Sequence, residues 1–128
     1  MKYSKGFNMV ELLIVVMIIG ILGAIAMSFY GDNVIAANRA EGRGALTQAA
    51  ATLEKCKSLY GAYNHANCSY ADFTSDAGYY GVSVVRDGVT FTLTATPAGP
   101  QLNDTDCTSM TLTNTGVKGG APATNECW

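Results

Sequence analysis

The chain has 128 residues, which is enough for one small domain and not for two. Lys and Arg total 8 against 10 Asp and Glu, so the formal net charge at pH 7 is −2. Without Lys2 and Lys5, which lie in a short basic start, six positive side chains face ten negative ones. A nucleic-acid-binding domain usually carries a basic face, so this balance argues against indiscriminate phosphate binding.

A long apolar segment follows the basic start. Between Met9 and Tyr30 the only charged side chain is that of Glu11. A helix here rises about 1.5 Å per residue and crosses most of the roughly 30 Å hydrocarbon core of a bilayer. By the positive-inside rule, Lys2 and Lys5 keep the N-terminal end in the cytoplasm, so the rest of the chain lies on the far side.

A cleaved secretory signal is an alternative interpretation, because Ala24-Ile25-Ala26 resembles an A-x-A cleavage site. This alternative predicts a soluble mature protein that begins at Met27. Three features disfavour it. Glu11 places a carboxylate at the edge of the apolar run, Gly6 joins the leader to Phe7 before that run, and helical patterning continues past residue 26.

Residues 5–16, Lys5-Gly6-Phe7-Asn8-Met9-Val10-Glu11-Leu12-Leu13-Ile14-Val15-Val16, closely resemble the signature of type IV prepilins and the related pseudopilins. In that family a membrane-embedded aspartyl peptidase cuts after the glycine and methylates the new N-terminal residue. The resemblance implies a prepilin leader over residues 1–6, cleavage between Gly6 and Phe7, and N-methyl-Phe7 at the start of the mature chain.

Glu11 has a physical interpretation that agrees with this resemblance. An ionised carboxylate in hydrocarbon costs about 2–3 kcal/mol even on lenient insertion scales, so such groups usually have a partner. The nearest available cation is the new α-amine at Phe7, and the family is thought to pair this glutamate with the N-terminus of a neighbouring subunit. The resemblance therefore implies an assembly salt bridge at Glu11 that favours docking and sets axial register. In the alternative, Glu11 snorkels to the membrane interface without a partner.

The helical pattern continues beyond the apolar segment. Apolar and small residues recur at three- and four-residue steps, which predicts one buried helix face up to about residue 60: Leu46, Ala49, Ala50, Leu53, Cys56 and Tyr60. Many type IV pilins carry a proline where this chain has Ser28, and because of this departure the resemblance leaves open whether the helix is kinked or melted there. We expect a transmembrane and filament-core helix over residues 7–30, its amphipathic continuation over 31–60, and a globular head over 61–128.

The sequence of the head predicts a short antiparallel sheet. Gly61 ends the helical pattern, and residues 61–81 read as a connecting loop. Strands are predicted over 80–86 and 89–96, joined by the hairpin signal Asp87-Gly88, and a third over about 108–114. Residues 116–122 read as a loop in the tail. Alternation predicts that Phe91, Leu93 and Ala95 face the core.

Four cysteines, Cys56, Cys68, Cys107 and Cys127, allow three pairings, and the sequence does not choose among them. No close pair such as the CxxC of a zinc site is present, and an exported chain favours two disulfides. Pairing in sequence order would contribute about 3 kcal/mol per bond. By resemblance, the loop from Cys107 to Cys127 matches the disulfide-bounded variable loop of pilins, which often contacts partners.

The predicted fold class is α+β, with one long N-terminal helix packed on a short antiparallel sheet, and this order looks like the type IV pilin fold. Two further stretches are similar to small minor type IVa pilins. They are Phe91-Thr92-Leu93-Thr94-Ala95, continuing through Thr111-Leu112 to Gly116, and the closing Cys127-Trp128.

No catalytic constellation accompanies these features. His65 is the only histidine, and we expect it to be a solvated loop residue. Asp104 and Asp106 beside Cys107 suggest calcium, but the twelve-residue calcium pattern is lacking, so we expect a solvated turn. We therefore predict no enzymatic activity, no metal site and no cofactor.

The sequence thus predicts a type IV pilus subunit, more in keeping with a minor than a major pilin. It would polymerise through its N-terminal helix and contribute to pilus assembly, adhesion or twitching motility. The expected partners are other pilins, the prepilin peptidase, the inner-membrane assembly platform and, before assembly, membrane lipid. The chain would span the inner membrane once, with its head in the periplasm, and then join an extracellular pilus.

Two further alternatives remain open. A type II secretion pseudopilin shares the N-terminal signature, although its head commonly carries a calcium-binding loop in place of a disulfide-closed tail. A DNA-uptake receptor pilin would need a local basic stripe, for which the head offers only Lys55, Lys57, Arg86 and Lys118. DNA is therefore a possible but not a favoured partner at the level of sequence.

Overall fold

A computed structural model describes residues 6–122 and 124–128 of the chain. Lys2 and Lys5 of the expected leader lie outside the described residues. The chain divides into two compact units, residues 1–34 and 35–128. Helix α1 (Met9–Tyr60) runs through both, and each unit is described by itself.

The first unit is an apolar helix without a core of its own. From residue 6 to residue 34, every residue whose burial is described is exposed, including the large apolar side chains from Met9 to Ile25. By length and composition, α1 contains a stretch that is able to cross a membrane. So much exposed apolar surface needs lipid or neighbouring helices to cover it.

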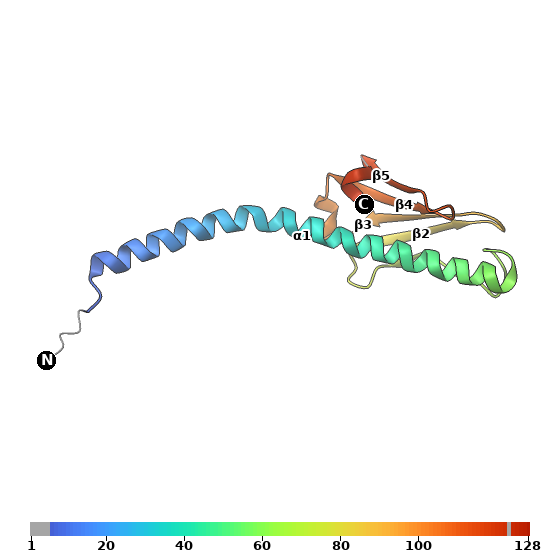
Figure 1. Ribbon diagram of the computed structural model, residues 1–128, viewed down its shortest axis with the longest axis horizontal. Helices are drawn as coiled ribbons and strands as arrows, with labels where there is room; N and C mark the ends of the chain where they lie inside the picture. Colours follow the sequence, from blue (N-terminus) through green and yellow to red (C-terminus); the bar gives the residue numbers. More distant parts are fainter. Residues whose placement is uncertain (1–5, 123) are drawn as a thin grey trace. The chain divides into compact units, whose positions relative to one another are not determined.

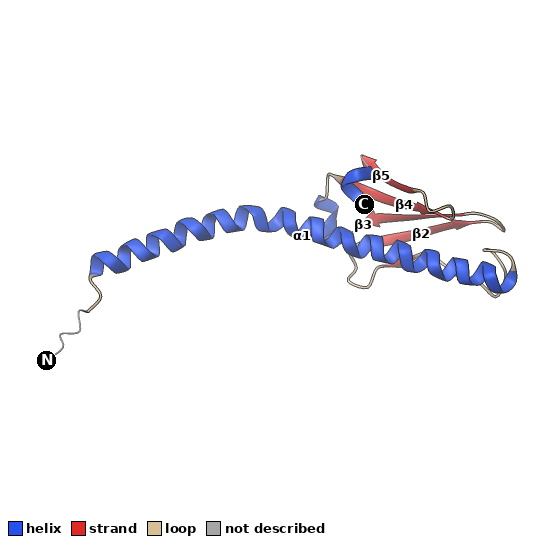
Figure 2. Cartoon of the chain, in the orientation of Figure 1, coloured by secondary structure: helices blue, strands red, loops and turns tan. Residues whose placement is uncertain are grey.

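The second unit is a helix on a sheet. Residues 35–60 of α1 lie along one face of a five-stranded antiparallel sheet with the order β1-β2-β3-β4-β5 (Figure 1). Its strands are β1 (Phe73–Thr74), β2 (Tyr80–Arg86), β3 (Phe91–Pro97), β4 (Cys107–Thr113) and β5 (Lys118–Pro122). A 3-10 helix η1 (Gly99–Asn103) follows β3, and a one-turn helix α2 (Thr124–Cys127) lies near the C-terminus (Figure 2).

The core forms between the helix and the inner face of the sheet. Leu46, Ala49 and Leu53 of α1 are fully or almost fully buried, and they meet strand residues that are buried to the same degree: Tyr80, Val82, Phe91, Leu93, Ala95 and Met110. Gly42 permits close approach, because a Cβ atom there would collide with Met110 Cε and lie 3.1 Å from ring carbons of Tyr80.

The predicted helix end and the predicted strand alternation agree with the structure. Helix α1 ends at Tyr60, and Phe91, Leu93 and Ala95 are buried. The predicted helix stripe extends one residue too far, since Tyr60 itself is 44 % exposed. The long helix on a short antiparallel sheet confirms the predicted α+β fold class.

The hairpin turn is longer than predicted. The Asp87 carboxylate accepts hydrogen bonds from the backbone N–H groups of Val89 and Thr90, both at 2.7 Å, and from Thr90 Oγ1 at 2.8 Å. Local side-chain acceptors of this kind favour a turn over a strand ladder. Strand β3 therefore begins at Phe91 and not at Val89.

The prediction of a loop over residues 116–122 is wrong. Strand β5 pairs with β4, with Gly119 opposite Thr111 and Gly120 opposite Met110. Its glycines have little intrinsic strand preference, but they allow close contact, because a Cβ at Gly120 would lie 2.7 Å from Cys127 Sγ. The predicted loop over 61–81 is also interrupted, by β1, whose Phe73 pairs with Val82.

Candidate functional site

The expected processing site lies just before α1. Gly6 and Phe7 precede the helix, and Phe7 is 76 % exposed. Glu11 is exposed in the first helical turn and makes no ion pair within the part of the chain that the structure describes. The bond between Gly6 and Phe7 is therefore outside regular secondary structure.

The four cysteines are joined in sequence order. Cys56 is bonded to Cys68 with a Cα–Cα distance of 5.9 Å, and Cys107 is bonded to Cys127 with a Cα–Cα distance of 5.2 Å. The first bond ties the end of α1 to the loop that follows it. The second ties the start of β4 to α2, and both of its cysteines are completely buried.

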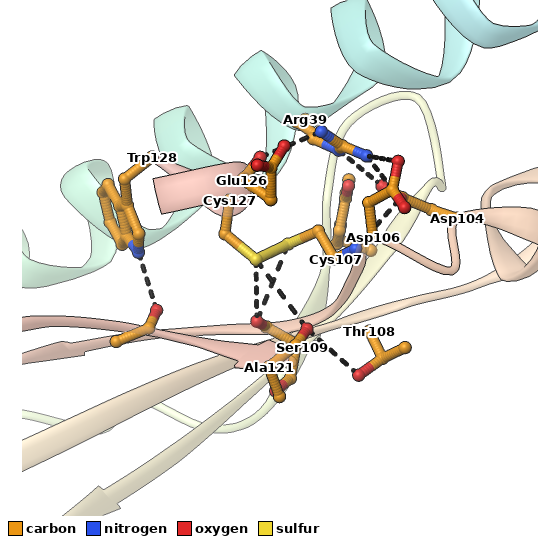
Figure 3. Close-up of a disulfide and its surroundings, with 12 residues drawn as sticks. Arg39, Asp104, Asp106, Cys107, Thr108, Ser109, Ala121, Glu126, Cys127 and Trp128 are labelled. Carbon is orange, nitrogen blue, oxygen red and sulfur yellow. Dashed lines mark hydrogen bonds and ion pairs between the residues drawn. A yellow bond between two sulfur atoms is a disulfide. The ribbon is translucent and has the colours of Figure 1, made fainter. Parts of the chain in front are cut away.

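Arg39 connects α1 to the disulfide-closed tail (Figure 3). Its Nε donates to Asp104 Oδ2 at 2.7 Å and its Nη2 to Asp104 Oδ1 at 2.6 Å, which is a bidentate pair. Nη1 donates to the carbonyl of Glu126 at 2.9 Å, and Nη2 lies 3.5 Å from Asp106 Oδ2. One guanidinium thus holds the loop after η1 and the residue next to Cys127.

Asp104 corrects the expectation of a solvated turn, which is right only for the exposed Asp106. Asp104 is 3 % exposed, and it also accepts hydrogen bonds from Cys107 N and Gln101 Nε2. Burial alone would raise the pKa of Asp104, but the Arg39 hydrogen bonds and the Cys107 N–H hold it below the usual range. The sequence gives no sign of this pair, since Arg39 and Asp104 are 65 residues apart.

The other end of the head is organised around Tyr63, which is buried in the loop after α1. Its hydroxyl donates to Glu54 at 2.7 Å, and its ring meets Phe91 edge-on at 4.9 Å. Burial raises the pKa of Tyr63 to about 12, and the hydrogen bond to Glu54 adds to this. Arg86 Nη1 donates to the carbonyls of Tyr63 at 2.7 Å and Cys68 at 2.5 Å. The loop is therefore fixed to both α1 and β2.

His65, which we expected to be a solvated loop residue, is half-buried against Tyr60. The two rings stack with a centroid distance of 4.7 Å and an interplanar angle of 7°. His65 Nδ1 accepts a hydrogen bond from Asn67 N at 3.2 Å, which orients the imidazole. The result is a partly exposed aromatic pair at the end of α1.

Most positive side chains of the second unit form no ion pair within the described residues. Only Arg39 forms ion pairs there. Lys57 Nζ lies 3.4 Å from the carbonyl of Val89 and 4.4 Å from the centre of the Tyr63 ring, while Arg86 binds carbonyls of the same loop. Lys55 lines a cavity beside Cys68. Lys55, Lys57 and Arg86, here called the loop cations, therefore lie around residues 61–70.

Comparison with known proteins identifies the family. A family model described as "Type IV minor pilin ComP, DNA uptake sequence receptor" matches residues 28–111, which is more than half of the chain. The chain belongs to this type IV minor pilin family. A second model, the prokaryotic N-terminal methylation motif, matches residues 1–27.

A solved structure supports the same assignment. It is described as "High-Resolution Structure of a Type IV Pilin from Shewanella oneidensis", and it is 28% identical to this minor pilin. The similarity covers 73% of this chain and 97% of that chain, with a TM-score of 0.55. The predicted pilin fold and the preference for a minor over a major pilin are both confirmed.

These findings establish what kind of protein the minor pilin is. It is a membrane-anchored subunit of an extracellular type IV pilus, where it interacts with other pilins. Its family and fold are those of structural subunits rather than of enzymes.

Proposed function

We propose that this minor pilin enters its pilus through the N-terminal helix and binds DNA with its head. The observation that carries the proposal is the match of residues 28–111 to a family described as a DNA uptake sequence receptor. This matched stretch includes the second half of α1, strands β1 to β3 and most of β4. DNA thus becomes a favoured partner, although composition alone argued against it.

The distribution of charge is compatible with DNA despite the net negative charge. The negative balance counts carboxylates that already have partners: Asp104 binds Arg39, Glu54 accepts from Tyr63, and Asp87 accepts from its own turn. None of the loop cations forms an ion pair in the described part of the second unit, although Lys57 is near enough to Asp87 to help lower the pKa of that carboxyl. Positive side chains without an internal partner can neutralise phosphates and release counterions.

A salt titration tests this function. The full-length processed protein in detergent micelles is titrated with a duplex at about 50 and 200 mM salt, and binding is expected to weaken as salt rises. Lys55→Gln and Lys57→Gln should each reduce the salt dependence by about one phosphate contact. Arg43→Gln removes the same charge from α1 outside the loop cations and serves as the matched control. A protein without salt-dependent binding is not a DNA receptor.

The N-terminus supports a specific route into the membrane and the pilus. In this proposal, prepilin peptidase removes residues 1–6 at the Gly6–Phe7 bond and methylates Phe7. Residues 7–30 then span the inner membrane, 31–60 continue the helix, and 61–128 form a periplasmic head that the assembly platform moves into the filament. The match to the methylation motif over residues 1–27 supports this route. So does the exposed Phe7 ahead of α1.

Mass spectrometry of sheared filaments tests the processing step. The expected N-terminal peptide begins with N-methyl-Phe7. A mature chain that begins at Met27 would instead identify a secreted soluble protein. The abundance of this peptide relative to the peptides of other pilins measures how small a share of the filament this subunit makes up.

A type II secretion pseudopilin is the weaker alternative. The described residues contain no group of three or more His, Cys, Asp or Glu side chains that could hold a metal ion. The tail is closed by the Cys107–Cys127 disulfide, the feature that favours a pilus subunit. Tight calcium binding in a calorimetric titration would favour the pseudopilin.

A further inference from the structure

A cavity of about 260 Å³ lies beside the Cys56–Cys68 disulfide, between the last turns of α1 and residues 67–70. This volume is below the roughly 300–1,000 Å³ of typical ligand pockets, so the cavity fits one ring-sized group. Its lining combines the disulfide and aromatic rings with polar groups, and six residues matter for the argument: Lys55, Leu59, Tyr60, Asn67, Ser69 and Tyr70.

The aromatic part of this lining is held in place before any ligand arrives. Tyr60 stacks on His65, and Asn67 N orients His65 through Nδ1. Arg86 binds the loop through the carbonyls of Tyr63 and Cys68, and the disulfide closes the same loop on α1. A ligand that stacks here therefore orders few side chains, which lowers the entropic cost of binding.

The charges at the cavity select for an anionic ligand. Lys55 is the only charged residue in the lining, and it makes no ion pair in the described part of the chain. Lys57, two residues further along α1, is not part of the lining, and its Nζ lies 4.4 Å from the centre of the Tyr63 ring. The nearest carboxylate along the helix, Glu54, is engaged by the Tyr63 hydroxyl. An aromatic ring beside an unpaired ammonium group matches a planar group that carries a phosphate.

We propose that this cavity receives one unpaired nucleobase, so that the head holds a single-stranded or frayed end of DNA. Tyr60 stacks on the base, and Lys55 binds the adjoining phosphate. The inference rests on the proposed DNA binding and extends it, because the bases of an intact duplex are stacked on one another and cannot enter the cavity without an unstacking cost. The duplex itself contacts the loop cations from outside.

Three DNA probes distinguish the contribution of base stacking to binding from that of phosphate charge. The full-length processed protein in detergent micelles is titrated with a blunt duplex, with the same duplex carrying a short single-stranded overhang, and with an abasic overhang of the same length. The two overhangs have equal phosphate charge and differ only in their bases. Stacking of one base on an aromatic side chain predicts roughly five- to hundred-fold tighter binding of the overhang that has bases.

Two variants test which residues cause the difference in affinity between the overhangs. Tyr60→Leu is expected to remove the difference between the overhang with bases and the abasic overhang, while affinity for the blunt duplex stays unchanged. Lys55→Gln should weaken both overhang probes and reduce their salt dependence. Tyr30→Leu, which removes an exposed tyrosine from the first unit, is the matched control and should change none of the three affinities.

The outcomes distinguish this inference from the proposed function. Equal affinity of the unmodified protein for the two overhangs overturns the base site, even if all three probes bind. A base effect that persists in Tyr60→Leu also overturns it. Failure of every probe to bind contradicts DNA binding as a whole. If Tyr60→Leu does not fold, the comparison of the two overhangs on the unmodified protein and on Lys55→Gln still decides.

Discussion

At the scale of single residues, Arg39 shows how one side chain fastens the tail to α1. Its guanidinium reaches both oxygens of Asp104 and the carbonyl of Glu126, and its side chain is only 12% exposed. Lysine could provide the charge but not this fork of donors. The pair is therefore worth more than an exposed ion pair, whose usual contribution is about 0–1 kcal/mol.

Asp104→Asn is expected to lower the free energy of unfolding at pH 7 by about 1–3 kcal/mol, since hydrogen bonds to a charged group are lost. The folded-state pKa of Asp104 is below its unfolded value. Its contribution to stability is therefore complete above about pH 4 and is lost as the pH falls through the folded pKa. Denaturant unfolding from pH 7 to pH 2 should give a flatter profile for the variant, with the difference from the unmodified protein smallest at the acid end.

Asp106→Asn is the control for that measurement, because Asp106 is 70% exposed and 3.5 Å from the same guanidinium. Its effect should stay within about 1 kcal/mol at every pH. Equal losses for the two variants would contradict the assignment of Asp104 as the main partner.

Gly42 and Gly44 form a second pair for comparison on α1. A methyl group at Gly42 collides with Met110 Cε and crowds the Tyr80 ring, whereas Gly44 has open space. Gly44→Ala should raise the free energy of unfolding by up to about 1 kcal/mol through helix propensity. In Gly42→Ala, overpacking should cancel that gain and lower the free energy of unfolding by a further 1–3 kcal/mol, roughly. Thermal unfolding of both variants measures the difference, and similar melting temperatures would contradict the close packing.

At the scale of elements, each disulfide holds a different short segment of the second unit. Cys56–Cys68 closes the loop that carries Tyr63 and His65, while Cys107–Cys127 holds β5 and α2 against β4. Strand β5 also depends on Trp128, whose Nε1 donates to the Gly119 carbonyl at 2.7 Å. Strand β5 has no buried residue, so the Cys107–Cys127 disulfide and Trp128 compensate for its lack of a local core, whereas the loop after α1 adds Tyr63 to the core.

Removing one disulfide at a time should loosen one element at a time. With 12 and 20 residues of sequence separation, each bond is expected to contribute about 3 kcal/mol. In hydrogen exchange, Cys56→Ser with Cys68→Ser should expose residues 61–70. Cys107→Ser with Cys127→Ser should expose β5 and α2. Uniform loss of protection across the sheet in either variant would show that the two ends of the head are not independent.

At the scale of the whole molecule, the helix of the first unit and the head have different tasks. Residues 9–25 present apolar surface that only lipid or other helices can cover, while the head has a core of its own. Glu11 is the only charged residue between residues 9 and 25, and from the resemblance to type IV prepilins we propose that it pairs with the Phe7 amine of a neighbouring subunit. We therefore expect Glu11 to contribute to assembly of the filament and not to folding of the subunit.

Glu11→Ala is therefore expected to leave the head folded and the leader cleaved, but to reduce incorporation into sheared filaments at least about tenfold. A loss of 2–3 kcal/mol in docking corresponds to more than one factor of ten. Glu11→Asp keeps the charge and should recover part of the incorporation. Quantitative immunoblots of filament and membrane fractions measure the ratio, and unchanged incorporation of Glu11→Ala would contradict the assembly salt bridge.

The sequence alone determined the features that depend on local or linear patterns. A long apolar run after a basic start, the Gly6–Phe7 junction and Glu11 were enough to recognise the pilin family, because these features lie next to one another in the sequence. The extent of α1 and strand β2, and the buried alternation in β3, followed from helix and strand periodicity in the same way. Residue propensities gave the wrong prediction at β5, where the glycines and a proline indicated a loop.

Only the tertiary structure decided what depends on residues far apart in the chain. It paired the cysteines, turned Asp104 from a solvated residue into the buried partner of Arg39, and brought the loop cations together around residues 61–70. The physical reason is that burial and charge pairing are properties of proximity in space. A net charge summed along the chain cannot show which carboxylates are already engaged and which cations remain available to a partner.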